Sequence, residues 1–211
     1  KTRKIINDPV FGFLSIPDGV LFQILQHPYM QRLNRIRQLG LSFFVYPGAM
    51  HSRFLHSLGA MHLMHEALTS LREKGVEISE TEATAAMAAI LLHDVGHGPF
   101  SHVFEEAGML PTGMSHEDIS LMMMEEIRDS FQTSKAHDVH DGKEIMNLAI
   151  AIFKDEYHKH FLHQLISSQL DVDRLDYLCR DSFFCGVTEG SVASARILKM
   201  MNVQDGRLVV E

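Results

Sequence analysis

The amino-acid sequence predicts an all-α protein: a helical bundle with a short N-terminal β or irregular arm and a C-terminal β-hairpin. Apolar residues recur at helical spacing through most of the chain, and capping-box pairs mark helix starts at Ser79 with Glu82 and at Ser115 with Asp118. Strand-forming residues beside turn signals are confined to the two ends. With 211 residues, 45% of them apolar, the chain is long enough for one packed core.

The elements are predicted in order from local patterns. The arm at 4–16 carries Asn7-Asp8-Pro9 and Gly12 between short apolar stretches, which is typical of a hairpin or an irregular segment. Helices are expected at 20–26 and 30–39, interrupted by Pro28, then at 52–75, 79–93, from Ser115 onward, and at about 143–154, 158–169, 172–183 and 191–201. The polar stretch 132–142 predicts a surface loop, and Asp205-Gly206 predicts a hairpin over 203–210.

These patterns divide the chain into an N-terminal arm at 1–18, a helical core at 19–201 and a last part at 202–211. Because the sequence stops inside an apparent strand, we expect the last part to be the start of a truncated C-terminal region.

Composition and charge exclude several classes of function. The 19 basic and 27 acidic side chains give a net charge of −8, which disfavours a broad nucleic-acid-binding surface. The longest apolar run, 85–92, is far shorter than the roughly 20 residues that span a bilayer, so we expect no membrane segment. Cys179 and Cys185 are too few for a zinc knuckle and are interpreted as reduced thiols of a cytoplasmic protein. The 14 histidines direct attention to a metal or acid–base centre.

The strongest chemical motif is His93-Asp94 at the end of a predicted Ala-rich helix, followed by a Gly-Pro loop. Neighbouring residues inside a helix point about 100° apart, so adjacent His and Asp can hold one ion only where the helix ends. His56 lies near the start of the preceding long helix and is followed by the small residues Gly59 and Ala60. We expect these small residues to let the two histidine-bearing helices approach closely.

A carboxylate for the same site is available at Asp173, which forms one polar stripe with Tyr177 and Asp181 at helical spacing. Two imidazoles with two carboxylates make a mixed nitrogen and oxygen set. Such a set suits Fe, Mn, Ni, Zn or Mg with positions left open for water and phosphate oxygens.

The pattern of His56, His93-Asp94 and Asp173 resembles the HD-domain metal-dependent phosphohydrolases. Further motifs fall in the order seen in the deoxynucleoside triphosphate triphosphohydrolase branch of that superfamily. They are Asn7-Asp8-Pro9, Gln31-Arg32-Leu33, Gln38-Leu39-Gly40, Arg53-Phe54, His56-Ser57-Leu58-Gly59, Gly96-His97-Gly98-Pro99-Phe100-Ser101-His102, His116-Glu117, Asp171-Val172-Asp173, Asp176-Tyr177 and Arg180-Asp181. The resemblance implies an HD-domain bundle for the core at 19–201.

The resemblance also implies roles for individual residues. The metal ligands are His56, His93, Asp94 and Asp173, and the catalytic group is His97, His116 and Glu105, where the vertebrate enzyme has Asp at the last position. The substrate contacts are Arg53, His102 and Arg174 at phosphates, Gln38 at the nucleoside, and Tyr177 with Asp181 at the sugar edge. The implied cofactor is a divalent transition metal (Fe, Mn, Ni or Zn), with Mg as a further candidate. The implied reaction converts a dNTP to deoxynucleoside and triphosphate in a cytoplasmic homo-oligomer.

Other interpretations stay open at this stage. His93-Asp94 alone fits a capped helix end, His97 and His116 fit phosphate positioning or surface imidazoles, and Arg53 fits an ion pair with an acid across a helix interface. The same site also fits another nucleotide, such as an alarmone, a cyclic dinucleotide or a nucleoside monophosphate. A non-catalytic HD module, stabilised by its metal, is the third possibility.

Overall fold

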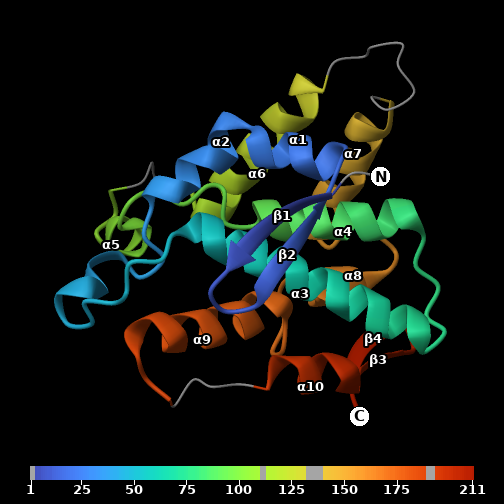
Figure 1. Cartoon of the computed structure of the whole chain (residues 1–211). Helices are drawn as coiled ribbons and strands as arrows, with labels where there is room; N and C mark the ends of the chain where they lie inside the picture. Colours follow the sequence, from blue (N-terminus) through green and yellow to red (C-terminus); the bar gives the residue numbers. More distant parts are fainter. Residues whose placement is uncertain (1–2, 110–112, 132–139, 189–192) are drawn as a thin grey trace.

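The computed structural model describes residues 3–109, 113–131, 140–188 and 193–211. Its elements are β1 (Arg3–Asp8), β2 (Gly12–Pro17), α1 (Val20–Gln26), α2 (Pro28–Arg32), η1 (Leu33–Arg35), η2 (Gly40–Phe44), α3 (Arg53–Glu73), α4 (Glu80–Leu92), α5 (Ser101–Glu106), α6 (His116–Ser130), α7 (His140–Phe153), α8 (His160–Gln164), α9 (Val172–Cys185), α10 (Ser194–Met200), β3 (Met201–Gln204) and β4 (Arg207–Val210). In Figure 1, α3 and α4 run side by side through the middle, with α7 against α4 and α9 against α3. The all-α prediction is confirmed.

The two ends form antiparallel hairpins, as predicted for the C-terminal end and as one of the two alternatives for the N-terminal arm. In the N-terminal arm, β1 pairs with β2, which buries Leu14 and Ile16 against the core while Phe13 faces outward. The carboxylate of Asp8 accepts hydrogen bonds from backbone N–H groups in the turn between the strands. At the other end, β3 pairs with β4 through a turn in which Asp205 and Gly206 both have positive φ, the geometry that Asp-Gly favours.

Side-chain caps start the helices where the sequence predicted them. The hydroxyl of Ser52 accepts from the N–H of Leu55 at the start of α3, and capping boxes at Ser79 and Ser115 start α4 and α6. The carboxylate of Asp171 caps α9 in the same way. Each cap satisfies a backbone donor that has no partner inside its own helix.

The predicted helix at 30–39 is wrong in its second half. The helix begins earlier, at Pro28, because proline is tolerated in the first turn of a helix, and it ends at Arg32 before the short η1. Beyond η1 the chain is extended and pairs with the segment before α3: the Gln38 N–H donates to the His51 carbonyl (3.0 Å), and the Arg53 N–H donates to the Ile36 carbonyl (2.8 Å). Pairing with a distant segment thus replaces local helix formation.

Other boundaries also differ from the prediction. Helix α7 starts at His140, inside the predicted loop 132–142, of which 132–139 lie outside the described residues. Helix α8 ends at Gln164 rather than 169, because the Asp171 carboxylate accepts the Ser168 N–H and draws the chain into a turn before α9. Helix α10 starts at Ser194, and 191–192 lie outside the described residues. Helix α5 and η2 were not predicted.

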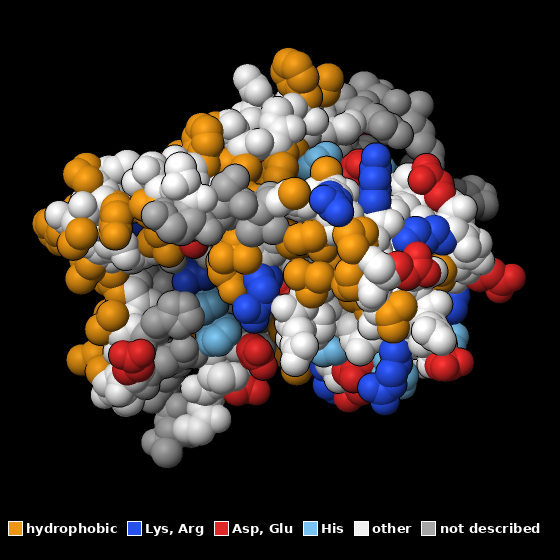
Figure 2. Space-filling view, turned by 90° about the horizontal axis from the view of Figure 1, so that it is seen from below, with side chains coloured by type: hydrophobic (Ala, Val, Ile, Leu, Met, Phe, Trp, Pro, Cys, Tyr) orange, Lys and Arg blue, Asp and Glu red, His pale blue; other side chains and the backbone are white. Residues whose placement is uncertain are grey.

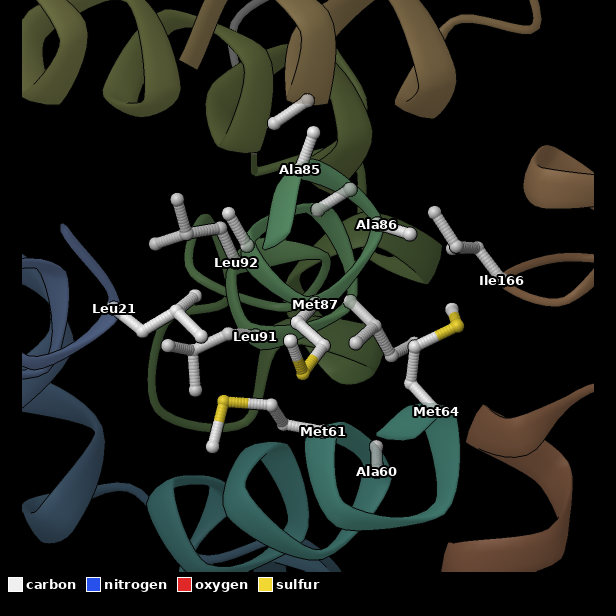
Figure 3. Packing of buried hydrophobic residues seen from close by; sticks show 14 of the residues in the cluster. Leu21, Ala60, Met61, Met64, Ala85, Ala86, Met87, Leu91, Leu92 and Ile166 are labelled. Atoms are coloured by element: carbon white, nitrogen blue, oxygen red, sulfur yellow. The ribbon is translucent and has the colours of Figure 1, made fainter. Parts of the chain in front are cut away.

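The core is centred on α4, which is buried on nearly every side. Figure 3 shows Ala85, Ala86, Met87, Leu91 and Leu92 of α4 surrounded by Ala60, Met61 and Met64 of α3, Leu21 of α1 and Ile166. A helix that is apolar all round is typical of a core helix. Because α4 is held from all sides, the residues that follow its last turn are held in fixed positions.

Glu82 is the most heavily hydrogen-bonded residue at the start of α4. Its carboxylate accepts from the Tyr157 hydroxyl (2.6 Å), the Lys159 ammonium (2.9 Å) and the Ser79 N–H (2.8 Å). Burial alone raises the pKa of this carboxyl, but these hydrogen bonds lower it from 4.5 to about 2. Glu82 therefore stabilises the fold in its ionised form.

We expect Glu82→Gln to lower the free energy of unfolding by about 1–3 kcal/mol at pH 7, because charge-assisted hydrogen bonds are lost. Since the pKa of Glu82 is lower in the folded state, its stabilisation is present above pH 4.5 and is lost as pH falls toward 2. Urea denaturation at pH 7 and pH 3 measures this, with Glu80→Gln, an exposed acid of the same turn, as the control. An equal destabilisation at both pH values would contradict the prediction.

Candidate metal centre

The four predicted metal ligands lie together where α3, α4 and α9 meet. His56 is in the first turn of α3, His93 caps the C-terminus of α4 and is followed by Asp94, and Asp173 is in the first turn of α9. One ligand atom each from His56, His93 and Asp173 lies within 4.8 Å of the others. Asp94 lies beside them, with Oδ1 3.4 Å from His93 Nε2 and Oδ2 3.8 Å from His56 Nε2.

Hydrogen bonds on the far side of each ring fix which imidazole nitrogen faces the centre. His93 Nδ1 lies 2.6 Å from the Ile90 carbonyl, which only accepts, so Nδ1 carries the proton. His56 Nδ1 lies 2.7 Å from the Asp176 carboxylate, which also accepts. In the neutral rings, the Nε2 lone pairs face each other at 3.4 Å, and Asp173 Oδ1 lies 2.9 and 3.2 Å from them. Three acceptors around one point fit a cation.

The charges of the cluster favour the binding of a cation. Burial lowers the pKa of His56, but hydrogen bonds to Asp173 and Asp176 outweigh burial and raise it to about 10 when no metal is bound. Burial raises the pKa of Asp94, but the neighbouring histidines and Arg53 hold it well below its usual range. Against the effect of burial, the neighbouring histidines also lower the pKa of Asp173, so Asp94 and Asp173 stay ionised at neutral pH and attract either protons or a metal ion to the imidazoles.

A buried network behind His56 holds that ring in place. The Asp176 carboxylate, which contacts His56, accepts two hydrogen bonds from Arg180 (2.9 and 3.0 Å), and Arg180 also donates to Asp8 of the N-terminal arm (2.7 Å). These side chains are completely buried. The sequence alone did not indicate a role for Asp8, Asp176 or Arg180. A signal was present for two of them, because Asp176 follows Asp173 by one helical turn and Arg180 follows Asp176 by another.

Gly59 lets α3 approach this network. A Cβ at Gly59 would lie 1.9 Å from Asp176 Oδ1 and 2.2 Å from an Arg180 guanidinium nitrogen. The sequence predicted that Gly59 serves the contact between the two histidine-bearing helices, and this is wrong: Gly59 serves the contact of α3 with α9. Figure 3 shows Ala60 on the side of α3 that faces α4, whereas Ala86 of α4 points toward Ile166.

Two of the predicted catalytic residues lie beside the predicted metal ligands. The His97 Nε2 is 3.2 Å from Asp94 Oδ1, its Nδ1 contacts the Ser101 hydroxyl, and its ring stacks on His116 with 4.1 Å between centroids. Burial lowers the pKa of His97, although Asp94 opposes this shift. Helix α6 brings His116 here because Gly96 has no side chain: a Cβ there would lie 2.5 Å from the His116 carbonyl oxygen. The side chains of Glu105 and His102 lie outside the described part of the structure.

A pocket of about 490 Å³ adjoins the centre and is lined by Gln38, Arg53, Tyr177 and Asp181, all predicted substrate contacts. Arg53 also forms the ion pair across the helix interface that was the alternative interpretation, since its guanidinium lies 2.7 Å from Asp94. Within the described ranges, the buried Arg53 Nε and Gln38 Oε1 have no hydrogen-bond partner. Arg174 is exposed and does not line this pocket.

Hydrophobic side chains surround the polar site on the surface. Figure 2 shows histidine, basic and acidic side chains gathered in a hollow of the face seen from below, with hydrophobic side chains beside them. Phe44 and Val45, just after the pocket-lining segment 37–42, are each 75% exposed, and Phe100 of the pocket wall is 42% exposed. Polar groups thus lie at the base of a site with an apolar rim.

We expect Asp176→Asn to weaken metal binding about 10- to 100-fold, because partners of metal-ligating histidines orient the ring and raise its basicity. A Mn²⁺ titration of metal-free protein measures the change in Kd. Asp129→Asn, at an exposed acid paired with Arg128, is the control and should leave Kd unchanged. An Asp176→Asn variant that binds Mn²⁺ as tightly as wild type would show that the contact with His56 does not matter for the metal.

Two further expectations concern membrane-spanning segments and the two cysteines. Within the described ranges, no helix combines the length and the apolar character needed to cross a membrane. Neither Cys179 nor Cys185 forms a disulfide within the described residues, and each side chain is half-buried.

The fold and the site together define a helical domain in which histidine and aspartate side chains converge as a candidate metal site. Residues 53–181 match the family model described as HD domain, and the chain belongs to this family. The resemblance inferred from His56, His93-Asp94 and Asp173 is therefore confirmed.

Relatives of known sequence and structure agree with this assignment. The chain is 35% identical over 209 residues to the uncharacterized protein YwfO of Bacillus subtilis, covering 99% of this chain and 46% of that protein. It is 34% identical over 214 residues to human deoxynucleoside triphosphate triphosphohydrolase SAMHD1, covering 88% of this chain and 34% of that protein. The crystal structure of a phosphohydrolase from Bacteroides thetaiotaomicron matches with 60% identity and a TM-score of 0.90, covering all of this chain and 49% of that one. The chain thus spans about half or less of the length of these relatives.

Proposed function

We propose that this protein is a metal-dependent phosphohydrolase that converts deoxynucleoside triphosphates to deoxynucleosides and triphosphate. The observation that carries the proposal is the convergence of His56 Nε2, His93 Nε2 and Asp173 Oδ1 beside a pocket that holds Arg53. The relatives called deoxynucleoside triphosphate triphosphohydrolase, from human and from Dictyostelium discoideum, support the substrate class. On the same resemblance we propose a cytoplasmic homo-oligomer whose HD core spans 19–201, between the arm at 1–18 and a further part starting at 202.

His56, His93, Asp94 and Asp173 would hold a divalent transition metal, either Fe, Mn, Ni or Zn, with Mg as a further candidate. When bound, such an ion supplies a water nucleophile at neutral pH and offsets charge on the attacked phosphate.

Arg53 provides a fixed positive charge for the substrate phosphates. One of its guanidinium nitrogens is held by Asp94, and Arg53 also lines the 490 Å³ pocket, which supports a contact of the remaining guanidinium with phosphate oxygens. Because the guanidinium is already held in place, ordering it costs little free energy when substrate binds. His102 and Arg174 are proposed as additional phosphate contacts; Arg174 has to swing from its exposed position to reach them.

His97 and His116 are proposed to supply the proton that the leaving group takes up. Cleavage of the bond between the α-phosphorus and the 5′ oxygen leaves a deoxynucleoside alkoxide, which takes a proton from one of these imidazoles, while water adds to the α-phosphorus. The contacts of His97 with Asp94 and Ser101 hold its ring, and the stacked His116 is close enough to share the role. Glu105 is proposed to orient the imidazole that donates.

Product analysis tests the proposed reaction. Protein loaded with Mn²⁺ or Fe²⁺ is incubated with each of the four dNTPs, and we expect deoxynucleoside and triphosphate in equal amounts. Nucleoside monophosphate with pyrophosphate, or hydrolysis only of an alarmone or a cyclic dinucleotide, would assign the site to another nucleotide reaction. A His97→Ala/His116→Ala double variant that folds but releases no product supports catalysis, whereas full turnover by that variant would contradict the roles given to both residues.

A further inference from the structure

We propose that His51 is a positioning residue that fixes the Asp181 carboxylate as an acceptor for the sugar hydroxyl of the nucleotide. His51 would thereby set the preference of the site for substrates that carry this hydroxyl. The inference rests on the proposed function, in which Asp181 lies at the sugar edge.

The contact between the two side chains is short and shielded. His51 Nε2 lies 2.6 Å from Asp181 Oδ1, and because a carboxylate only accepts, the imidazole N–H donates. The His51 side chain is fully buried, whereas Asp181 is 24% exposed. The His51 ring also stacks on Phe184 with 4.7 Å between centroids. A rigid buried donor therefore holds a carboxylate that remains open to the pocket.

The backbone of His51 holds a second residue of the pocket. Its carbonyl accepts the N–H of Gln38 at 3.0 Å, within the short antiparallel pairing of Arg37 with Ser52. Close packing fixes this segment on α9, because a Cβ at Gly48 would lie 2.3 Å from the Phe184 carbonyl oxygen. His51 thus links Gln38 and Asp181, which come from distant parts of the sequence and line the same wall.

The hydrogen bond from His51 matters for the orientation of Asp181 because Asp181 lies where two pockets meet. It lines the 490 Å³ pocket together with Arg53, and it also lines a neighbouring pocket of about 320 Å³ together with Tyr46 and Leu178. Without the His51 contact, the carboxylate can turn toward either of the two pockets. With it, one oxygen is occupied, and the carboxylate plane is set before substrate arrives.

The chemistry of the substrate then selects what Asp181 recognises. A carboxylate can bind only donors, and a deoxynucleoside triphosphate has one sugar O–H, at the 3′ position. With the phosphates beside Arg53 and the metal ligands, the sugar is the next group along the pocket wall.

The unused nitrogen of His51 argues against a purely structural role. His51 Nδ1 is buried and has no hydrogen-bond partner among the described residues, and an unpaired buried polar atom destabilises a fold. A phenylalanine would fill the same stack on Phe184 without this cost. The feature that phenylalanine lacks is the Nε2–H that Asp181 accepts.

Two variants distinguish the hydrogen-bond donor of His51 from the packing of its ring. His51→Phe keeps an aromatic ring but removes the donor, and His51→Gln supplies an amide N–H at the position of Nε2. Wild type and both variants are assayed with dNTPs and with 2′,3′-dideoxy analogues, and their melting temperatures confirm that they fold. We expect wild type to prefer the dNTP in kcat/KM, and His51→Phe to lose about 10-fold in kcat/KM on dNTPs through KM while retaining its rate on the dideoxy analogue. His51→Gln should recover most of the preference.

The outcomes distinguish this inference from the proposed function. If wild type hydrolyses dNTPs and His51→Phe keeps the full preference for the 3′ hydroxyl, His51 does not position Asp181 for recognition. An equal loss on both substrates likewise overturns the inference, because it shows a structural role. If wild type hydrolyses no dNTP, the proposed function fails and this inference fails with it.

Discussion

Replacing His93 with alanine is expected to lower dNTP turnover by at least about 10³-fold, because the proposed metal centre would lose a buried ligand and with it the positive charge that the ion would place beside the phosphate. His93 is fixed at the end of a core helix by the hydrogen bond from its Nδ1 to the Ile90 carbonyl (2.6 Å). Steady-state assays at saturating Mn²⁺, with the bound metal quantified, measure the effect.

His65→Ala is the matched control for that variant. His65 also lies on a core helix, α3, but more than half of its side chain is exposed, and it is not among the metal ligands. This variant should keep wild-type turnover and metal content. A His93→Ala protein that retains turnover within a few fold of wild type would show that the cluster is not the hydrolytic centre.

Replacing Gly59 with alanine is expected to destabilise the fold, although alanine in the middle of a helix normally stabilises by about 1 kcal/mol relative to glycine. The added Cβ would lie 1.9 Å from Asp176 Oδ1, so the buried network of Asp176 and Arg180 must move. Breaking a buried ion pair costs about 3–5 kcal/mol. At about 2–4 °C per kcal/mol for a domain of this size, Tm should fall by about 6 °C or more.

Thermal denaturation of Gly59→Ala beside Gly98→Ala tests this prediction. A Cβ at Gly98 meets no atom within 4 Å, so Gly98→Ala should leave Tm nearly unchanged. Gly59→Ala should also weaken Mn²⁺ binding, because Asp176 holds the ring of His56. A Tm equal to or above that of wild type would contradict the close approach of α3 and α9.

The parts of the fold that could be predicted from sequence are those with local causes. Ser79 and Ser115 start their helices because each forms a reciprocal cap with a residue three positions later. The Asp205-Gly206 turn also has its cause within a few residues. By contrast, the end of α2 at Arg32 depends on pairing of 36–38 with 51–53, which local periodicity does not contain.

The same distinction holds for the candidate site. His56, His93, Asp94 and Asp173 could be proposed because the types and spacing of metal ligands are visible in the sequence. The residues behind them could not, because the link from Asp8 to Arg180 joins the N-terminal arm to α9 across most of the chain. The contact of His51 with Asp181 is equally distant in sequence. Such pairs become visible only when the helices are packed.

The most direct test of a shared ion at His56, His93, Asp94 and Asp173 is a Mn²⁺ titration of metal-free protein with dNTP present. Bound metal, released triphosphate and Tm are measured in the same samples. We expect triphosphate release to rise in proportion to the bound ion, and Tm to rise with it, because ligands from three helices are joined by the ion. Full turnover in protein shown to hold no metal would contradict the shared ion. Bound Mn²⁺ that changes neither turnover nor Tm would contradict it as well.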